Sequence, residues 1–196
     1  MMIALFDLDS TITKKDSLAD FIQYAVGKPA YFMGLLTLSP MLIAYAIKLI
    51  PNHAAKEKLI THFFKDWDAD HFRKLAHKYS CNQIDKITRP KAMEKIRWHQ
   101  GQGHKVVIVS ASVECWLKGW CDKNEVDLVA TQLEIKNNKL TGKFATRNCH
   151  GIEKANRVRE AYDLSLCDHI YAYGDSRGDK ELLALADESF YKPFRE

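Results

Sequence analysis

The chain has 196 residues, of which 46% are hydrophobic and 28% charged, a balance typical of a folded protein rather than a disordered one. This length predicts one domain with a large insertion or two small domains. The net charge of +4 comes from 29 basic and 25 acidic residues without a long run of one sign, which argues against nucleic-acid binding. Five cysteines without a CxxC pair argue against a disulfide framework or a zinc knuckle. Reduced cysteines and the lack of a signal peptide predict a cytoplasmic protein.

The first predicted strand runs directly into two acidic residues. Residues 3–6 are apolar, and Asp7 and Asp9 follow at the spacing that directs extended side chains toward the same region. Two neighbouring buried carboxylates repel each other unless a cation or a proton relieves the repulsion. The pair therefore predicts a metal site in which one carboxylate also takes part in chemistry.

Residues 16–80 follow helical periodicity and contain no convincing strand. Within this block, residues 29–47 include no charged side chain, which approaches the length of a membrane span. Because Ser39-Pro40 interrupts this stretch, we predict two short apolar helices instead of one span. Two interpretations stay open: a helical subdomain that packs on itself, or an apolar surface that faces a lipid-like substrate or the membrane interface.

The second half of the chain alternates helices with short apolar strands. We predict helices over 90–100, 112–123, 151–162 and 180–186, strands over 106–109, 126–130, 169–173 and 189–191, and a hairpin over 133–144 that turns at Asn137-Asn138. This alternation predicts an α/β fold with a Rossmann-like parallel sheet. We expect residues 1–14 and 85–196 to form the catalytic core and residues 15–84 to form a helical cap.

Polar side chains follow several of these strands. Ser110 ends the second strand, Asp175 and Asp179 follow a later one, and Lys154 lies at the start of a helix. The carboxyl ends of parallel strands lie at one edge of the sheet, so these groups should meet Asp7 there. An acidic cluster with oxygen ligands and one fixed cation favours Mg²⁺ over Zn²⁺.

These motifs resemble the haloacid dehalogenase-like superfamily of phosphatases and related phosphotransferases. The DxDxT of residues 7–11, Ser110, Lys154 and the GDxxxD of residues 174–179 match its four motifs in order. The helical block resembles the cap of the phosphoserine-phosphatase-like subgroup. Each motif is weak alone, but four in the right order at the right strand ends are a strong match.

The resemblance implies a role for each matched residue. Asp7 would be the nucleophile that forms an aspartyl-phosphate, and Asp9 would protonate the leaving oxygen and then activate water. The carboxylates of Asp7 and Asp175, with the backbone carbonyl of Asp9, would bind Mg²⁺. Ser110 and Lys154 would bind the phosphoryl oxygens. Asp179 would position Lys154 or the waters on the metal.

The chain departs from the phosphoserine-specific pattern around the substrate. Asp16 stands where a Glu is usual, and Lys56 or Lys58 stands where an Arg is usual. Ser110 is followed by Ala111-Ser112 instead of a Gly-Gly pair. The substrate is therefore open between a small phosphate such as phosphoserine and a phospholipid head-group phosphate such as phosphatidylglycerophosphate. The apolar cap resembles those of relatives that dephosphorylate such lipid head groups. The second interpretation implies peripheral contact with the inner membrane through the cap. A phosphotransferase and a non-catalytic phosphate-binding module stay as alternative functions, and the sequence does not fix the oligomeric state.

Overall fold

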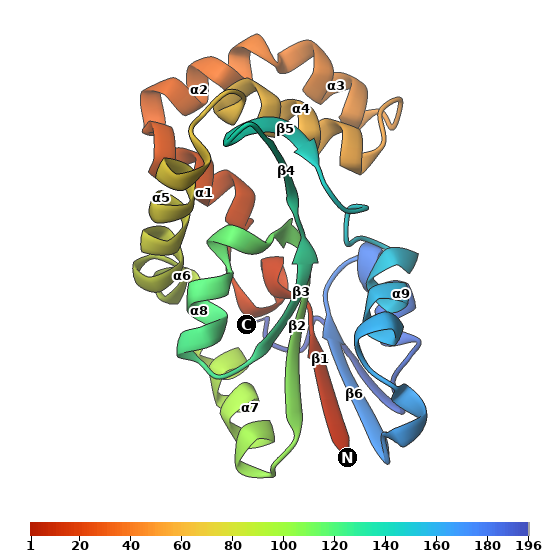
Figure 1. The fold of residues 1–196 in the computed structure, drawn as a ribbon. Coiled ribbons are helices and arrows are strands. Elements are labelled where there is room, and N and C mark those ends of the chain that lie inside the picture. The colour runs from red at the N-terminus through yellow and green to blue at the C-terminus, as the bar shows by residue number, and fades with distance from the viewer. Residues whose placement is uncertain (196) are drawn as a thin grey trace.

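A five-stranded parallel sheet lies at the centre of the computed structural model, which describes residues 1–195 (Figure 1). Its strands are β1 (Met2–Phe6), β2 (Lys105–Val113), β3 (Asp127–Thr131), β6 (His169–Gly174) and β7 (Glu188–Tyr191). The order is β3-β2-β1-β6-β7, with β1 between β2 and β6. All neighbouring strands pair in parallel, so their carboxyl ends share one edge. The predicted α/β fold is confirmed.

Both faces of the sheet are buried. Along β1, Ala4 and Phe6 belong to one hydrophobic cluster, whereas Ile3 and Leu5 belong to another. Alternation with period two explains why such a central strand reads as a continuous apolar run. Helices cover the two faces: α7 (Pro90–Gly101) and α8 (Lys118–Lys123) contribute to the first cluster, and α9 (Ile152–Ala161) and α10 (Lys180–Leu183) to the second.

A block of helices is inserted between β1 and α7. Its members are α1 (Ser17–Val26), α2 (Lys28–Thr37), α3 (Ser39–Ala46), α4 (Asn52–Phe64), α5 (Ala69–Asn82) and α6 (Ile84–Ile87). The predicted break of the apolar segment is confirmed, because α2 and α3 meet at a bend of 68°. Among the described residues no single helix is long and apolar enough to cross a bilayer. The bent pair α2–α3 has the required length and apolar composition only when its two helices are taken together. Figure 1 shows α2 and α3 at the end of the molecule farthest from α7.

A hairpin from the second half of the chain joins the helical block. Strands β4 (Leu133–Lys136) and β5 (Lys139–Phe144) pair antiparallel, and Asn137 and Asn138 take positive φ at the turn, as predicted. On β5, Gly142 has φ of 85°, and a Cβ there would lie 2.6 Å from Cα of Thr61 on α4. Glycine at 142 therefore allows the hairpin to lie directly against α4.

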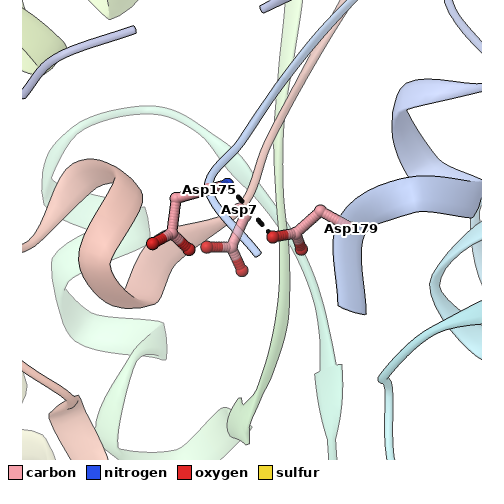
Figure 2. A group of neighbouring side chains, drawn as sticks. All are labelled: Asp7, Asp175 and Asp179. Carbon is pink, nitrogen blue, oxygen red and sulfur yellow. Dashed lines mark hydrogen bonds between the residues drawn. The ribbon is translucent and has the colours of Figure 1, made fainter. Parts of the chain in front are cut away.

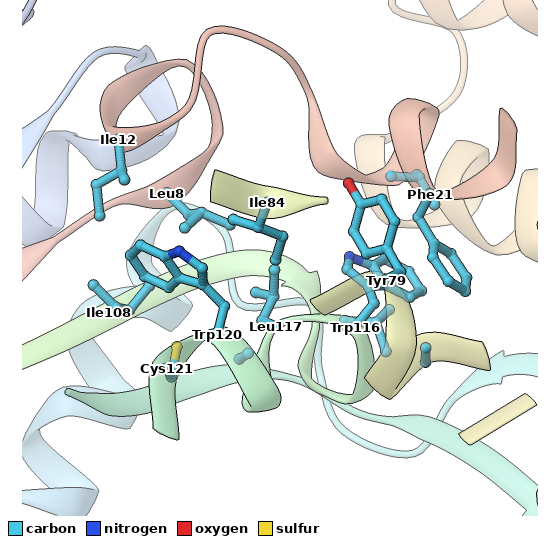
Figure 3. Close-up of a cluster of buried hydrophobic side chains, with 14 of the residues drawn as sticks. Leu8, Ile12, Phe21, Tyr79, Ile84, Ile108, Trp116, Leu117, Trp120 and Cys121 are labelled. Atoms are coloured by element: carbon cyan, nitrogen blue, oxygen red, sulfur yellow. The ribbon is translucent and has the colours of Figure 1, made fainter. Parts of the chain in front are cut away.

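An aromatic cluster joins the helical block to the sheet (Figure 3). Trp116, which follows β2, stacks on Phe21 of α1 with the ring centroids 4.7 Å apart. Phe21 also packs edge to face with Tyr79 of α5 at 5.2 Å. Because all three side chains are buried, this contact fixes α1 and α5 over the end of β2.

Two predicted helices are partly wrong. Instead of starting a helix at 112, the chain continues β2 to Val113, forms a 3₁₀ turn over 114–116 and only then enters α8. Tertiary contacts override the apolar periodicity, because Val113 pairs with Thr131 of β3 and the Ser112 hydroxyl bonds to Asp9. The last helix, α10, ends at Leu183 rather than 186.

Candidate active site

The carboxyl edge of the sheet opens into a pocket of about 230 Å³, called here the strand-edge pocket. Its lining residues are Asp7, Asp9, Ser10, Asp16, Asn52, Lys56, Ala111, His150, Lys154, Asp175, Ser176 and Asp179. Asp7 follows β1, and Asp175 follows the neighbouring strand β6. The fold therefore brings the predicted acidic residues of two distant segments together with Lys154 of α9.

Asp7 is buried and bonded on both carboxylate oxygens. The Thr11 hydroxyl donates to Oδ2 at 2.8 Å, and the Lys154 ammonium donates to Oδ1 at 2.5 Å. Thr11 reaches back because the chain turns sharply within residues 8–12, where Asp9 is extended and Ser10 has φ of 64°. Burial raises the pKa of Asp7 to about 7, while the charge of Lys154 opposes the rise. Ionised Asp7 thus depends on nearby positive charge.

Lys154 is the cation that the site provides. Its Nζ atom lies 2.5 Å from Oδ1 of Asp7 and 2.6 Å from Oδ1 of Asp179, and its side chain is 2% exposed. Burial alone would lower the pKa of Lys154, but the two carboxylates raise it above its usual range. The lysine therefore stays charged, and it can offer a fixed positive charge to an anion in the pocket.

Asp179 organises the loop that follows β6. Its Oδ2 accepts hydrogen bonds from the backbone N–H groups of Asp175 and Ser176 and from the Ser176 hydroxyl, at 2.8–3.1 Å. Burial would raise the pKa of Asp179, but Lys154 and these donors hold it below its usual range. A Cβ at Gly174 would lie 2.6 Å from Cβ of Asp179, so this close approach requires glycine. Asp179 thereby fixes both Asp175 and Lys154.

Three buried carboxylates form a cluster suited to a metal ion (Figure 2). One oxygen each from Asp7, Asp175 and Asp179 lies within 4.8 Å of the others. An all-oxygen donor set fits a hard divalent cation such as Mg²⁺. Lys154 and Arg195 balance part of the negative charge of the cluster, since Lys154 pairs with Asp7 and Asp179 and Arg195 donates to Oδ2 of Asp175.

Asp9 contributes to the same pocket in a different way from Asp7. The backbone N–H of Ser17 donates to its Oδ1 at 2.6 Å, and the Ser112 hydroxyl donates to its Oδ2 at 2.5 Å. Its carboxylate is not part of the three-aspartate cluster, and the sequence had predicted the backbone carbonyl of Asp9, rather than its carboxylate, near the metal. Burial and the charge of Asp16 raise the pKa of Asp9. This environment favours a carboxyl group that holds a proton.

Only some of the remaining predicted site residues line the strand-edge pocket. Asp16 lines the strand-edge pocket, but Ser110, Ser112 and Lys58 do not. Ser110 is buried at the same edge, where its Oγ accepts from the Ser112 N–H at 3.0 Å. Ser112 instead bonds to Asp9. Lys58 is exposed on α4, whereas Lys56, the alternative at this position, reaches the pocket and donates to the Ala111 carbonyl at 3.1 Å.

Sequence reasoning gave no site role to Asn52, His150 or Arg195, of which Asn52 and His150 line the strand-edge pocket and Arg195 contacts Asp175. Asn52 comes from α4, His150 precedes α9, and Arg195 lies at the end of the described chain. A Cβ at Gly178 would lie 2.2 Å from Cε1 of His150, so glycine at 178 makes room for the imidazole. No local sequence signal indicated Asn52 or Arg195.

Comparisons with known proteins find a matching family model and related sequences. The family model of haloacid dehalogenase-like hydrolases matches residues 4–184. Protein CicA of Caulobacter vibrioides is 32% identical over 198 residues, which cover 99% of this chain and 87% of CicA. A Mycobacterium tuberculosis protein described as a probable phosphatase is 29% identical over 205 residues, covering 98% of this chain and 69% of its own.

Solved structures share the fold. A Bordetella pertussis protein of unknown function aligns with a TM-score of 0.79 at 21% identity, over 96% of this chain and 88% of its own. The phospho-aspartyl intermediate analogue of phosphoserine phosphatase aligns with a TM-score of 0.67 at 18% identity, over 95% of this chain and 84% of its own.

Proposed function

Because the chain belongs to the haloacid dehalogenase-like hydrolase family, we propose that it is a Mg²⁺-dependent phosphomonoesterase that acts through an aspartyl-phosphate on Asp7. The observation that supports this most directly is the buried Lys154 ammonium between Asp7 and Asp179, beside Asp175. A nucleophile, a fixed cation and an acidic cluster are the groups that phosphoryl transfer requires. The similarity to a probable phosphatase supports the same class of reaction.

In the proposed reaction, a carboxylate oxygen of Asp7 attacks phosphorus, and the bond to the leaving oxygen breaks. Asp9 gives its proton to that oxygen, and the alcohol departs. Asp9 then takes a proton from water, which attacks phosphorus, releases inorganic phosphate and restores Asp7. The raised pKa of Asp9 supports its first role as an acid.

The other residues bind and orient. Lys154 and Ser110 would bind the phosphoryl oxygens, and Asp179 would position Lys154 through the 2.6 Å bond between them. Asp7, Asp175 and Asp179 would hold Mg²⁺, with the Asp9 backbone carbonyl as the family resemblance suggests. Bound Mg²⁺ would neutralise charge on the phosphoryl group.

For the domains, we propose residues 1–14 and 85–196 as the catalytic core and 15–84 as the cap.

Metal removal tests this proposal. We expect the protein to release phosphate from p-nitrophenyl phosphate in the presence of Mg²⁺, and chelation by EDTA to lower the rate by at least ~10²-fold, because the acidic cluster would lose its positive charge. Added Mg²⁺ should restore the rate. With glycerol added, equal yields of p-nitrophenol and phosphate are expected for a hydrolase, whereas a deficit of phosphate would indicate a phosphotransferase. Turnover that EDTA leaves unchanged would contradict the metal assignment.

We further propose that the outer face of α2–α3, with the turn that follows α3, contacts an anionic membrane. Its exposed apolar side chains are Phe32, Met33, Leu36, Ile43, Ile47 and Leu49, each more than 60% exposed. No acidic residue occurs between positions 21 and 56, while Lys28 and Lys48 flank this apolar face. An apolar surface whose own stretch of sequence carries lysines but no acidic residue is complementary to an anionic lipid surface.

Vesicle flotation checks this contact. We expect the protein to float with vesicles that contain phosphatidylglycerol and to stay behind with pure phosphatidylcholine vesicles. The double variant Phe32→Asp/Leu36→Asp should lose flotation because it places charge in the apolar face. Leu166→Asp is the matched control, since Leu166 is 69% exposed in the turn before β6, at the opposite edge of the sheet. A protein that does not float with anionic vesicles would contradict the proposal.

A further inference from the structure

A second pocket of about 170 Å³, called here the cap pocket, lies inside the helical block. Nine apolar or aromatic side chains from α1, α2, α3 and α4 line it, among them Ile22, Leu35 and Leu42. Its polar lining residues are Asp16, Asn52 and Lys56, and the same three residues also line the strand-edge pocket. The two pockets therefore meet at these three side chains.

This arrangement gives the two ends of a ligand opposite surroundings. A phosphate on the Asp7 side meets Lys154, and the group esterified to it can extend past the three shared residues into the cap pocket. Past the three shared polar residues, that group meets only apolar and aromatic side chains. An apolar cavity of roughly 150 Å³ holds a molecule the size of benzene, so the cap pocket can enclose a group of about six carbon atoms.

We propose that the cap pocket binds the apolar part of the leaving group, so that the substrate is a phosphate monoester of an alcohol with a hydrocarbon chain. This proposal rests on the phosphatase function above. It deepens that function by choosing among the substrate classes that the motifs leave open. Burial of each methylene contributes about 0.8 kcal/mol, which corresponds to roughly fourfold in binding.

A zwitterionic leaving group such as serine fits this arrangement less well. The Asp16 carboxylate accepts from the Ala19 N–H at 3.0 Å, and the Lys56 ammonium donates to the Ala111 carbonyl at 3.1 Å. Each of the two charged side chains at the junction of the pockets thus directs one hydrogen bond to backbone, which holds its charge at the junction. Beyond them the cap pocket has no charged partner for an amine or a carboxylate, and burial of an unpaired charge is costly.

A series of alkyl phosphates tests the proposal. With Mg²⁺ present, kcat/KM should rise about fourfold per methylene from ethyl to hexyl phosphate and then level off at octyl, when the pocket is full. Phosphoserine should react no faster than ethyl phosphate. A flat series, or phosphoserine as the better substrate, would overturn this inference while leaving the phosphatase function intact. No turnover of any ester, p-nitrophenyl phosphate included, would remove both.

Two tryptophan variants test whether the cap pocket causes the preference for longer chains, and an assay with lipid vesicles tests which substrate carries the chain. Leu35→Trp should lower the hexyl-to-ethyl ratio of kcat/KM by at least ~10-fold, because indole would occupy the pocket. Thr37→Trp, exposed two residues along α2, should keep the ratio of the wild type. Equal ratios in all three proteins would overturn the assignment. Phosphatidic acid in vesicles distinguishes the two sources of such a hydrocarbon chain. Hydrolysis of both phosphatidic acid and hexyl phosphate indicates that the substrate is a bilayer lipid. Hydrolysis of hexyl phosphate alone indicates that the substrate is a dissolved ester.

Discussion

Replacing Asp7 with asparagine is expected to lower phosphatase activity by at least ~10³-fold, because a neutral amide cannot attack phosphorus as a carboxylate does. The substitution keeps the shape of the side chain, so Thr11 retains a partner at position 7. Lys154 keeps Asp179 as its counterion at 2.6 Å. The loss should therefore come from the chemistry and not from a collapsed site.

Stability provides the internal check on this variant. Burial raises the pKa of Asp7 to about 7, which means that the native site accommodates a neutral group at this position at little cost. We expect Asp7→Asn to unfold thermally at the wild-type temperature or slightly above it. Initial rates on p-nitrophenyl phosphate with Mg²⁺ give the activity. Asp168→Asn, at an exposed carboxylate paired with the chain's amino group, is the control that should stay active.

Retained activity in Asp7→Asn would contradict the nucleophile assignment directly. Loss of activity together with loss of folding would instead assign Asp7 a structural role. The expected combination, an inactive protein that is at least as stable as the wild type, separates a reacting carboxylate from one that only holds the site together.

The sequence predicted the sheet well because the signals for its strands are local. Continuous apolar runs marked β1 and β2, and the polar residues at their ends indicated which edge of the sheet carries the site. Asp7, Asp175, Asp179 and Lys154 converge as expected, since parallel strands place their carboxyl ends together.

Features that depend on packing between distant segments were not predictable in this way. Ser112 was expected in a helix near the substrate, but it extends β2 and bonds to Asp9, a contact between positions 103 residues apart. The choice between Lys56 and Lys58 depended on the rotation of α4, which apolar periodicity did not resolve. The cap pocket needs four helices at once, so no single segment reveals it.

Replacing Lys154 with methionine is expected to destabilise the fold by about 3–5 kcal/mol, because it leaves the Asp7 and Asp179 carboxylates buried without their cation. Methionine is one atom shorter than lysine and keeps an unbranched apolar stem, so little packing is lost. The lysine side chain is 2% exposed, and its ammonium lies within 2.6 Å of both carboxylates. Denaturant unfolding at neutral pH measures the change in the free energy of unfolding.

A surface pair provides the matched control. Lys123 lies 2.5 Å from Asp85, as close as Lys154 is to Asp7, but the side chains of Lys123 and Asp85 are both about half exposed. Water and salt screen such a pair, so Lys123→Met should leave the free energy of unfolding almost unchanged. Similar losses for the two variants would contradict the claim that burial makes Lys154 structurally important.

The double variant Asp7→Asn/Lys154→Met isolates the electrostatic part of this loss. With an amide at position 7, removal of the lysine leaves one uncompensated carboxylate instead of two. The cost of Lys154→Met should therefore be smaller in the Asp7→Asn background than in the wild type, by about 1–3 kcal/mol. Equal costs in the two backgrounds would mean that lost packing, and not the charge between the two aspartates, explains the destabilisation. A positive coupling would establish that the phosphate-binding lysine proposed here also neutralises the nucleophile in the resting protein.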